Sequence, residues 1–263
     1  MSRAPLHSIF DTKYTRRGLR GLATGAYVSR VRAVTYDFYR WRYESDFVVK
    51  LGLAAVFGCL TGFGALIKAY FPWTPVPITG QLFFVLASAV VLGKYYGGLS
   101  QVIYAFVGIL GVPWFAGSNT NPQPLIDGVP GLYRGVGGLA ILWGATFGYI
   151  IGFILASFFL GWAVDSRLKF RRTRYLGLLL LAGVGIVYLA GAIWFYLWWT
   201  TGFGIVAAWG DLSLDGLLVK AVLPFVPLDL LKAGIVLAVG GVVLPNRPFG
   251  AEKDAASPQR VSA

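Results

Sequence analysis

Asp229 and Lys232 are two charged residues within an apolar stretch near the C-terminus, in the run Pro-Leu-Asp-Leu-Leu-Lys-Ala at 227–233. A charge near the middle of a bilayer costs at least about 2.5–3.5 kcal/mol, so it persists only when it is paired or solvated by a cavity. Their spacing places both side chains on one helix face, where they can form an ion pair. The pair is therefore a candidate ligand site. The alternative is that Asp229 caps a helix and Lys232 extends to the membrane surface.

Three other segments carry polar or glycine residues between apolar runs: Val-Pro-Ile-Thr-Gly-Gln at 76–81, Phe-Ala-Gly at 115–117 and Gly-Ala-Thr-Phe-Gly-Tyr at 144–149. Pockets in membrane proteins form where irregular backbone lines a cavity, so these segments are candidate pocket walls. Thr79 and Gln81 fit helix caps equally well. The candidate ligand contacts are Asp229, Lys232, Gln81, Thr79, Tyr149, Phe115 and Arg134.

Two of these candidates also have simpler interpretations. Tyr149 fits a residue of the aromatic belt at the membrane surface. Arg134 fits a solvated loop residue, and as a ligand contact it would pair with an anion.

The elements that must position these residues are membrane helices. Of 263 residues, 57% are hydrophobic and 13% are charged, whereas a soluble domain carries about 25% charged residues. Apolar runs of about 20 residues can cross a hydrocarbon core, so the sequence predicts an all-α, polytopic integral membrane protein with a six-helix bundle. The predicted spans are 47–70, 79–92, 99–112, 139–164, 175–200 and 228–244, with a polar loop at 113–138 and an amphipathic piece at 214–222.

The basic residues predict the orientation of these spans. With six spans, both termini share one side, which then holds eighteen Lys and Arg residues against three on the other side. Cytoplasmic loops are enriched in such residues, so we expect a cell-membrane protein with both termini in the cytoplasm and the candidate segments at the outer face. The predicted parts are a basic N-terminal segment at 1–46, a transmembrane substrate-binding domain at 47–244 and a polar tail at 245–263. The N-terminal segment could also lie on anionic lipid as an interfacial helix.

Several classes of function are disfavoured. The net charge of +12 is spread over membrane-flanking segments rather than one patch, which argues against nucleic-acid binding. One cysteine and one histidine argue against a metal site, and we expect no cofactor. The chain has no G-x-x-x-x-G-K-[ST] phosphate loop, so it cannot hydrolyse ATP by that route. An enzyme acting on membrane lipids would usually need several converging titratable groups, and Asp229 is the only carboxylate within the predicted spans.

The ordered motifs resemble those of the BioY family, the biotin-specific S components of energy-coupling-factor transporters. The resemblance rests on 76–81, Leu-Ser-Gln at 99–101, 115–117, Gly-Tyr at 148–149 and 227–233. It implies a six-helix subunit that binds biotin from outside, with Asp229 and Lys232 among its binding residues. It also implies a membrane T component and two ATPase subunits as partners. Alternatives are an S component for another vitamin and a solitary transporter.

Two features depart from the family pattern. Ala145 and Phe147 replace residues of the usual Gly-Pro-Thr-Gly-Gly-Tyr, and Phe147 could reshape the pocket. The loop after 115–117 is longer than in most members, so it could form a lid.

The first span carries a ladder of small residues, Ala54, Gly58 and Gly62. Such a ladder lets a second helix approach closely, so it is a candidate docking site for the T component. Packing among the chain's own helices would use the same residues.

Overall fold

The computed structural model describes residues 36–39, 41–42, 44–117, 124–126, 130–202 and 212–245. Helices dominate this part of the chain, which confirms the all-α class apart from one two-stranded sheet. Most residues of the basic N-terminal segment and of the polar tail lie outside the described ranges. The predicted interfacial location of the N-terminal segment therefore stays a prediction. The elements are α2 (Phe47–Leu66), β1 (Lys68–Ala69), β2 (Ile78–Thr79), α3 (Gln81–Ile109), η2 (Leu139–Trp143), α4 (Phe147–Ser166), η3 (Leu168–Arg171), α5 (Thr173–Thr201), α6 (Leu214–Ala221) and α7 (Val226–Val243).

The long element α3 is a helical hairpin rather than a straight rod. Gly93 breaks it with φ 74° and ψ −155°, a backbone conformation that favours glycine. Across the break, Gln81 Nε2 donates a hydrogen bond of 2.6 Å to the Tyr104 hydroxyl. In a straight helix these residues would lie about 35 Å apart at 1.5 Å per residue. The two halves therefore run side by side in opposite directions, as predicted for spans 79–92 and 99–112.

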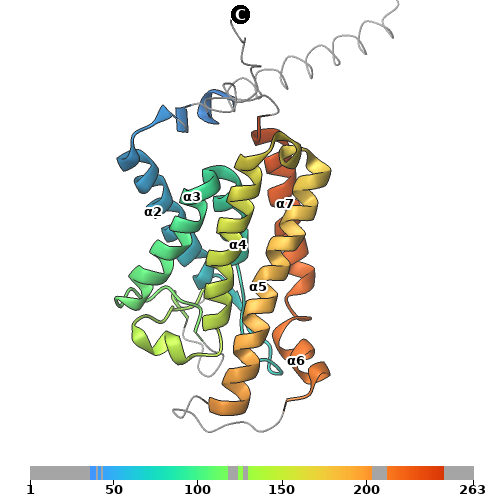
Figure 1. Cartoon of the computed structure of the whole chain (residues 1–263). Helices are drawn as coiled ribbons and strands as arrows, with labels where there is room; N and C mark the ends of the chain where they lie inside the picture. The colour runs from blue at the N-terminus through green and yellow to red at the C-terminus, as the bar shows by residue number, and fades with distance from the viewer. Residues whose placement is uncertain are drawn as a thin grey trace, which may run out of the picture.

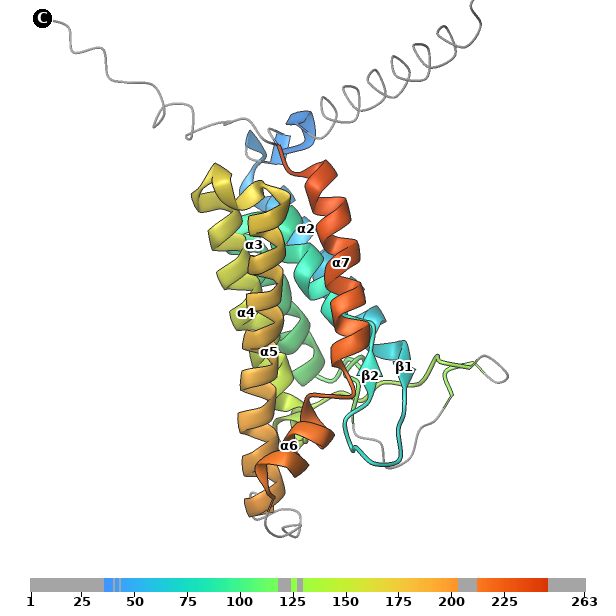
Figure 2. The same ribbon diagram turned by 90° about the vertical axis from the view of Figure 1, so that its right-hand side faces the viewer.

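The helices form one elongated bundle with two distinct ends (Figures 1 and 2). The start of α2, the turn of α3, η3 and the end of α7 lie at one end. The sheet, η2 and α6 lie at the other, which we call the sheet end. α4 packs between α3 and α5, and α7 packs against α3 and α5. The start of α2 and the end of α7, the first and last helix of the bundle, therefore lie at the same end of the molecule.

The outer surface of the bundle is that of a multi-pass membrane protein. Within the described residues, α2, α3, α4 and α5 are each long and apolar enough to cross a membrane, and α6 with α7, bent by 51°, makes a fifth candidate span. α3 reaches this length only as a whole, because the break at Gly93 divides it into two antiparallel halves, each shorter than the about 20 residues of a usual span. Large apolar side chains face outward along these helices, including Val56, Phe63, Leu178, Leu189, Ile193 and Val239.

Two predicted span boundaries were wrong. The first span ends at Leu66 rather than Tyr70, because Lys68 leaves the helix and bonds to backbone carbonyls in β1. The span predicted at 139–164 is interrupted: η2 is followed by Gly144 in an extended conformation, with φ −85° and ψ 156°, and α4 starts only at Phe147. The amphipathic piece predicted at 214–222 is confirmed as α6.

The small-residue ladder of α2 packs inside the chain. Ala54 is fully buried, and Gly58 and Gly62 are also buried. A Cβ on Gly58 would lie 2.9 Å from the carbonyl oxygen of Ser100, and one on Gly62 would lie 2.6 Å from the Trp114 ring. The second half of α3 and the Trp114 indole that follows it therefore fill the place predicted for a partner helix. The ladder therefore serves internal packing, the alternative use of the same residues, and its docking role stays a prediction.

At the end opposite the sheet, residues that precede α2 are fastened onto the bundle. The Tyr39 hydroxyl donates to the Val90 carbonyl at 2.9 Å. Arg42 Nη1 donates to the Val91 carbonyl at 2.7 Å, and its Nη2 pairs with Asp165 Oδ1 at 3.3 Å. These contacts tie the chain before the first span to the turn of α3 and the end of α4.

Candidate functional site

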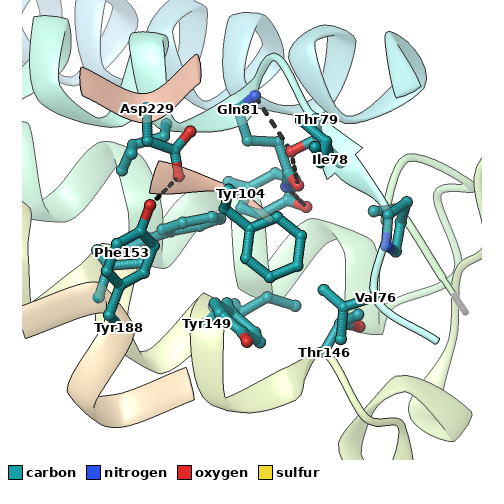
Figure 3. A pocket seen from close by; sticks show the side chains of 16 residues that line it. Val76, Ile78, Thr79, Gln81, Tyr104, Thr146, Tyr149, Phe153, Tyr188 and Asp229 are labelled. Atoms are coloured by element: carbon teal, nitrogen blue, oxygen red, sulfur yellow. Dashed lines mark hydrogen bonds between the residues drawn. The ribbon is translucent and has the colours of Figure 1, made fainter. Parts of the chain in front are cut away.

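A cavity with an empty volume of about 580 Å³ opens in the sheet end of the bundle. Ligand pockets typically combine apolar walls with a few placed polar groups, and this cavity has both kinds of lining (Figure 3). Its walls come from the chain before and at the start of α3, the second half of α3, α4, α5 and the start of α7. The lining residues are Val76, Pro77, Ile78, Thr79, Gln81, Leu82, Tyr104, Ala116, Thr146, Tyr149, Ile150, Phe153, Val187, Tyr188, Phe225 and Asp229.

Asp229 provides the negative charge of the cavity. It lies in the first turn of α7, where the helix dipole favours a carboxylate, and its residue is 6% exposed. Tyr188 donates its hydroxyl to Oδ2 at 2.8 Å, and Lys232 Nζ lies 2.7 Å from Oδ1. A carboxylate offers about four lone-pair sites, so these two partners leave acceptor capacity for a ligand.

Lys232 is held behind the carboxylate rather than in the cavity lining. Its Nζ donates to Asp229 Oδ1 and also to the carbonyl oxygen of Thr79 at 2.6 Å. The second bond connects α7 to β2, in the segment that forms one wall of the cavity. Lys232 therefore balances the charge of Asp229 and fixes this wall to the last helix.

A second polar group comes from Thr79, Gln81 and Tyr104. The Thr79 hydroxyl donates to Gln81 Oε1 at 2.9 Å, and Gln81 Nε2 donates to the Tyr104 hydroxyl at 2.6 Å. An amide nitrogen carries two hydrogens and a phenol carries one, so one Gln81 N–H and the Tyr104 O–H remain as donors. Among the described residues, neither has a second bonded partner inside the protein. Figure 3 shows this group and Asp229 lining the same cavity.

The remaining walls are apolar or held in place by polar contacts outside the cavity. The Tyr149 hydroxyl donates to the Ala221 carbonyl at 2.6 Å, which joins α4 to α6. Its ring packs over Gly191, where a Cβ would lie 2.4 Å from a ring carbon. Ile150, Phe153 and other apolar side chains complete the surface. The cavity can therefore hold a ring system and an alkyl chain beside its polar groups.

Lys68 lies behind the wall at Ala116. It is 3% exposed, and its Nζ donates to the carbonyl oxygens of Ala116 and Arg134, each at 2.8 Å. Burial lowers the pKa of Lys68 to about 8, because removing the ammonium from water disfavours its charged form. Lys68 thus holds two parts of the 113–138 loop against the strand pair.

The structure brings four of the seven predicted contacts to the cavity: Asp229, Gln81, Thr79 and Tyr149. Lys232 lies behind Asp229. Phe115 is fully buried and packs edge-on against Tyr104 with ring centroids 5.2 Å apart, so it supports the wall from behind. The side chain of Arg134 is exposed, and it does not line the cavity.

The loop predicted as a lid includes residues 118–123 and 127–129, which lie outside the described part of the chain. Of the described loop residues, only Ala116 lines the cavity. Phe147 is not among the lining residues; its ring packs against Trp194 with centroids 5.1 Å apart.

Tyr188 and Tyr104 are functional candidates that the motifs did not reveal. Both lie in the middle of long apolar helices, away from the segments that drew attention. Their phenol groups could have been noticed, because a hydroxyl in an apolar run needs a partner. Which partner each one has depends on how the helices pack.

The cavity therefore suits a small ligand with a polar ring, N–H donors and an apolar body. Asp229 can accept hydrogen bonds at one side, and Gln81 and Tyr104 can donate them at another. The described residues contain no cluster of three His, Cys, Asp or Glu side chains that could bind a metal ion.

The sequence and the fold are both similar to those of known transport proteins. The profile of the BioY family matches residues 40–127 and 124–248. The chain is 38% identical over 168 residues to the probable biotin transporter BioY of Methanothermobacter thermautotrophicus, which covers 64% of this chain and 93% of that protein. It is 34% identical over 190 residues to the probable biotin transporter BioY of Pyrococcus horikoshii, with 72% and 93% covered.

One solved structure shares this fold. The crystal structure of the S-component for biotin from an ECF-type ABC transporter aligns with a TM-score of 0.53 at 23% identity, over 74% of this chain and 89% of that chain. At this level of identity the likeness concerns the fold.

Proposed function

The chain belongs to the BioY family, and from this premise we propose that it captures biotin in the cavity at the sheet end. In this proposal it delivers the vitamin inward together with an ATP-driven energy-coupling-factor module. It acts as a binding and transport subunit, not as an enzyme.

The observation that carries the proposal is the buried carboxylate of Asp229 at the cavity wall. The ureido ring of biotin offers two N–H donors and one carbonyl acceptor, and a carboxylate is a strong acceptor for such donors. A hydrogen bond to a charged group contributes about 1.5–3 kcal/mol. Tyr188 and Lys232 hold the carboxylate in place through hydrogen bonds to its two oxygens.

The group formed by Gln81 and Tyr104 serves the ureido carbonyl in this account. Both residues retain a donor after their mutual hydrogen bond, and a carbonyl accepts two such bonds. The apolar walls, among them Ile150 and Phe153, receive the thiophane ring and the alkyl chain. Thr79 orients Gln81, and Lys232 acts on the ligand through Asp229 rather than by direct contact.

The partners follow from the missing energy source. The chain has no phosphate loop, so ATP-driven uptake would need separate subunits that hydrolyse ATP. We propose a membrane T component and two ATPase subunits. The eighteen basic residues assigned to one side support cytoplasmic termini and an outward-facing sheet end. Residues 47–244 are then the substrate-binding unit, flanked by two cytoplasmic segments.

A binding experiment with the purified full chain tests this function. In detergent, the protein should bind radiolabelled biotin, and unlabelled biotin should displace it while thiamine and riboflavin should not. Displacement by another vitamin but not by biotin would reassign the substrate.

A transport experiment tests the partners. In a biotin-requiring host, uptake should depend on co-expressed T component and ATPases, and it should stop when the ATPase phosphate-loop lysine is replaced. Uptake at full rate by the chain alone would identify a solitary transporter instead.

A further inference from the structure

The cavity has a polar end and an end without charge. Asp229 lies one turn inside the start of α7, and Phe153 lies well inside α4. By contrast, Thr146 precedes α4, and Val76, Pro77 and Ala116 belong to the connecting segments of the sheet end. Figure 3 shows Asp229, Gln81 and Thr79 on one side of the cavity and Val76 and Thr146 on the other, and this second wall is apolar or neutral.

Every basic side chain described near the sheet end is engaged away from the cavity or lies exposed. Lys68 bonds to two carbonyl oxygens, and Lys232 bonds to Asp229 and Thr79. Lys220 Nζ lies 3.4 Å from the Trp73 carbonyl and over the Trp199 ring. The Arg134 side chain is exposed. In the part of the chain that the structure describes, no Lys, Arg or His lines the cavity.

The neighbouring connections do not add a cation. Residues 118–123, 127–129 and 203–211 contain no Lys, Arg or His. An unpaired carboxylate is costly to bury, so a ligand carboxylate has no favourable place inside this cavity. Biotin, with its ureido ring toward Asp229, would keep its valerate carboxylate in water outside the cavity.

On this basis, and resting on the proposed function, we propose that the site recognises the bicyclic head of biotin and does not read the carboxylate. Its substrate class then includes biotin derivatives whose carboxyl group is esterified or joined by an amide, such as biotinyl-lysine. The wall formed by Val76, Pro77 and Ala116 has no charged group that would select for a free carboxylate.

Competition against radiolabelled biotin tests this specificity with the purified full chain. Biotin methyl ester and biotinyl-lysine should displace the label at concentrations within about threefold of that of biotin, a difference of well under 1.4 kcal/mol. N-methylation of the ureido ring should weaken displacement strongly, because it removes a donor to Asp229. A loss of roughly 30-fold or more for the ester and the amide would overturn the proposal, since this is what removal of a buried ion pair costs.

Two variants identify the cation if one exists. Arg134→Ala and Lys68→Met should leave the ratio of biotin to methyl-ester affinity unchanged. Selective loss of biotin affinity in either variant would show that its cation pairs with the carboxylate and would refute the proposal. Failure of the unaltered chain to bind labelled biotin would instead reject the proposed function itself, so the two failures are distinguishable.

Discussion

Replacing Asp229 by asparagine separates the two roles that this carboxylate has in the structure. The first role is to balance Lys232, whose Nζ lies 2.7 Å away, with the two side chains 16% and 9% exposed. Removing one partner of a buried pair costs about 3–5 kcal/mol. Lys232 retains some exposure and its bond to the Thr79 carbonyl, so we expect Asp229→Asn to lose about 3 kcal/mol of stability, the low end of that range.

The second role is to accept hydrogen bonds from the ligand. A neutral amide acceptor gives up about 1–1.5 kcal/mol relative to a carboxylate for each bond, which corresponds to roughly tenfold in the Kd of biotin. Asp229→Ala loses the whole bond and should weaken binding by roughly 100-fold.

Two measurements on the same purified proteins distinguish these roles: thermal unfolding in detergent and equilibrium binding of labelled biotin. The double variant Asp229→Asn with Lys232→Met removes the unpaired ammonium and should regain most of the lost stability. Its biotin affinity should remain as low as that of Asp229→Asn. Wild-type affinity in Asp229→Asn would refute the carboxylate as ligand acceptor, and a larger affinity loss in Lys232→Met than in Asp229→Asn would assign the direct contact to the lysine.

Three further predictions concern the frame around the site. Burial lowers the pKa of Lys68 to about 8 from 10.5, so the folded protein releases this proton at lower pH than the unfolded chain does. The unfolding temperature should therefore rise from pH 8 to pH 10, and Lys68→Met should abolish that rise. An equal rise in the variant would contradict the assignment to Lys68. Gly58→Leu should destabilise the protein by about 1–3 kcal/mol or more through overpacking against α3. Gly52→Leu, at a position where a Cβ has open space, should unfold at the same temperature as the wild type. Equal unfolding temperatures of the two variants would show that Gly58 does not pack against α3. Gly93→Ala should lower the unfolding temperature because φ is 74° and the new Cβ would lie 2.0 Å from Asp165 Oδ2, and an unchanged temperature would mean that the α3 turn tolerates a different backbone.

The part of the fold that sequence alone predicted best is the part dictated by burial in lipid. Apolar runs located every long helix, and the turn between the second and third spans follows from the glycines around Gly93. The ends of the spans were less predictable, because the hydropathy of the residues up to Tyr70 does not show whether they continue the helix or form a strand. Lys68 could have marked the earlier end, since a charge there needs the carbonyl partners that only a turn of the chain supplies.

The site was predicted to the extent that it lies in local motifs. Asp229 and Gln81 belong to short runs whose composition is unusual for a membrane helix. Tyr188 bonds to a residue 41 positions away, and that pairing depends on how α5 packs against α7. Phe115 was chosen because it belongs to the motif at 115–117, and Arg134 because it could pair with an anion; the fold buries Phe115 in the core and leaves Arg134 exposed.

The most direct test of the account observes the ureido group itself while it is bound. Biotin labelled with ¹⁵N at both ureido nitrogens, bound to the purified chain, should show at least one N–H proton shifted downfield, as for a hydrogen bond to a carboxylate. That shift should persist in Lys232→Met and disappear in Asp229→Asn. Bound biotin whose ureido N–H resonances do not respond to Asp229→Asn would contradict the claim that this carboxylate receives the ligand.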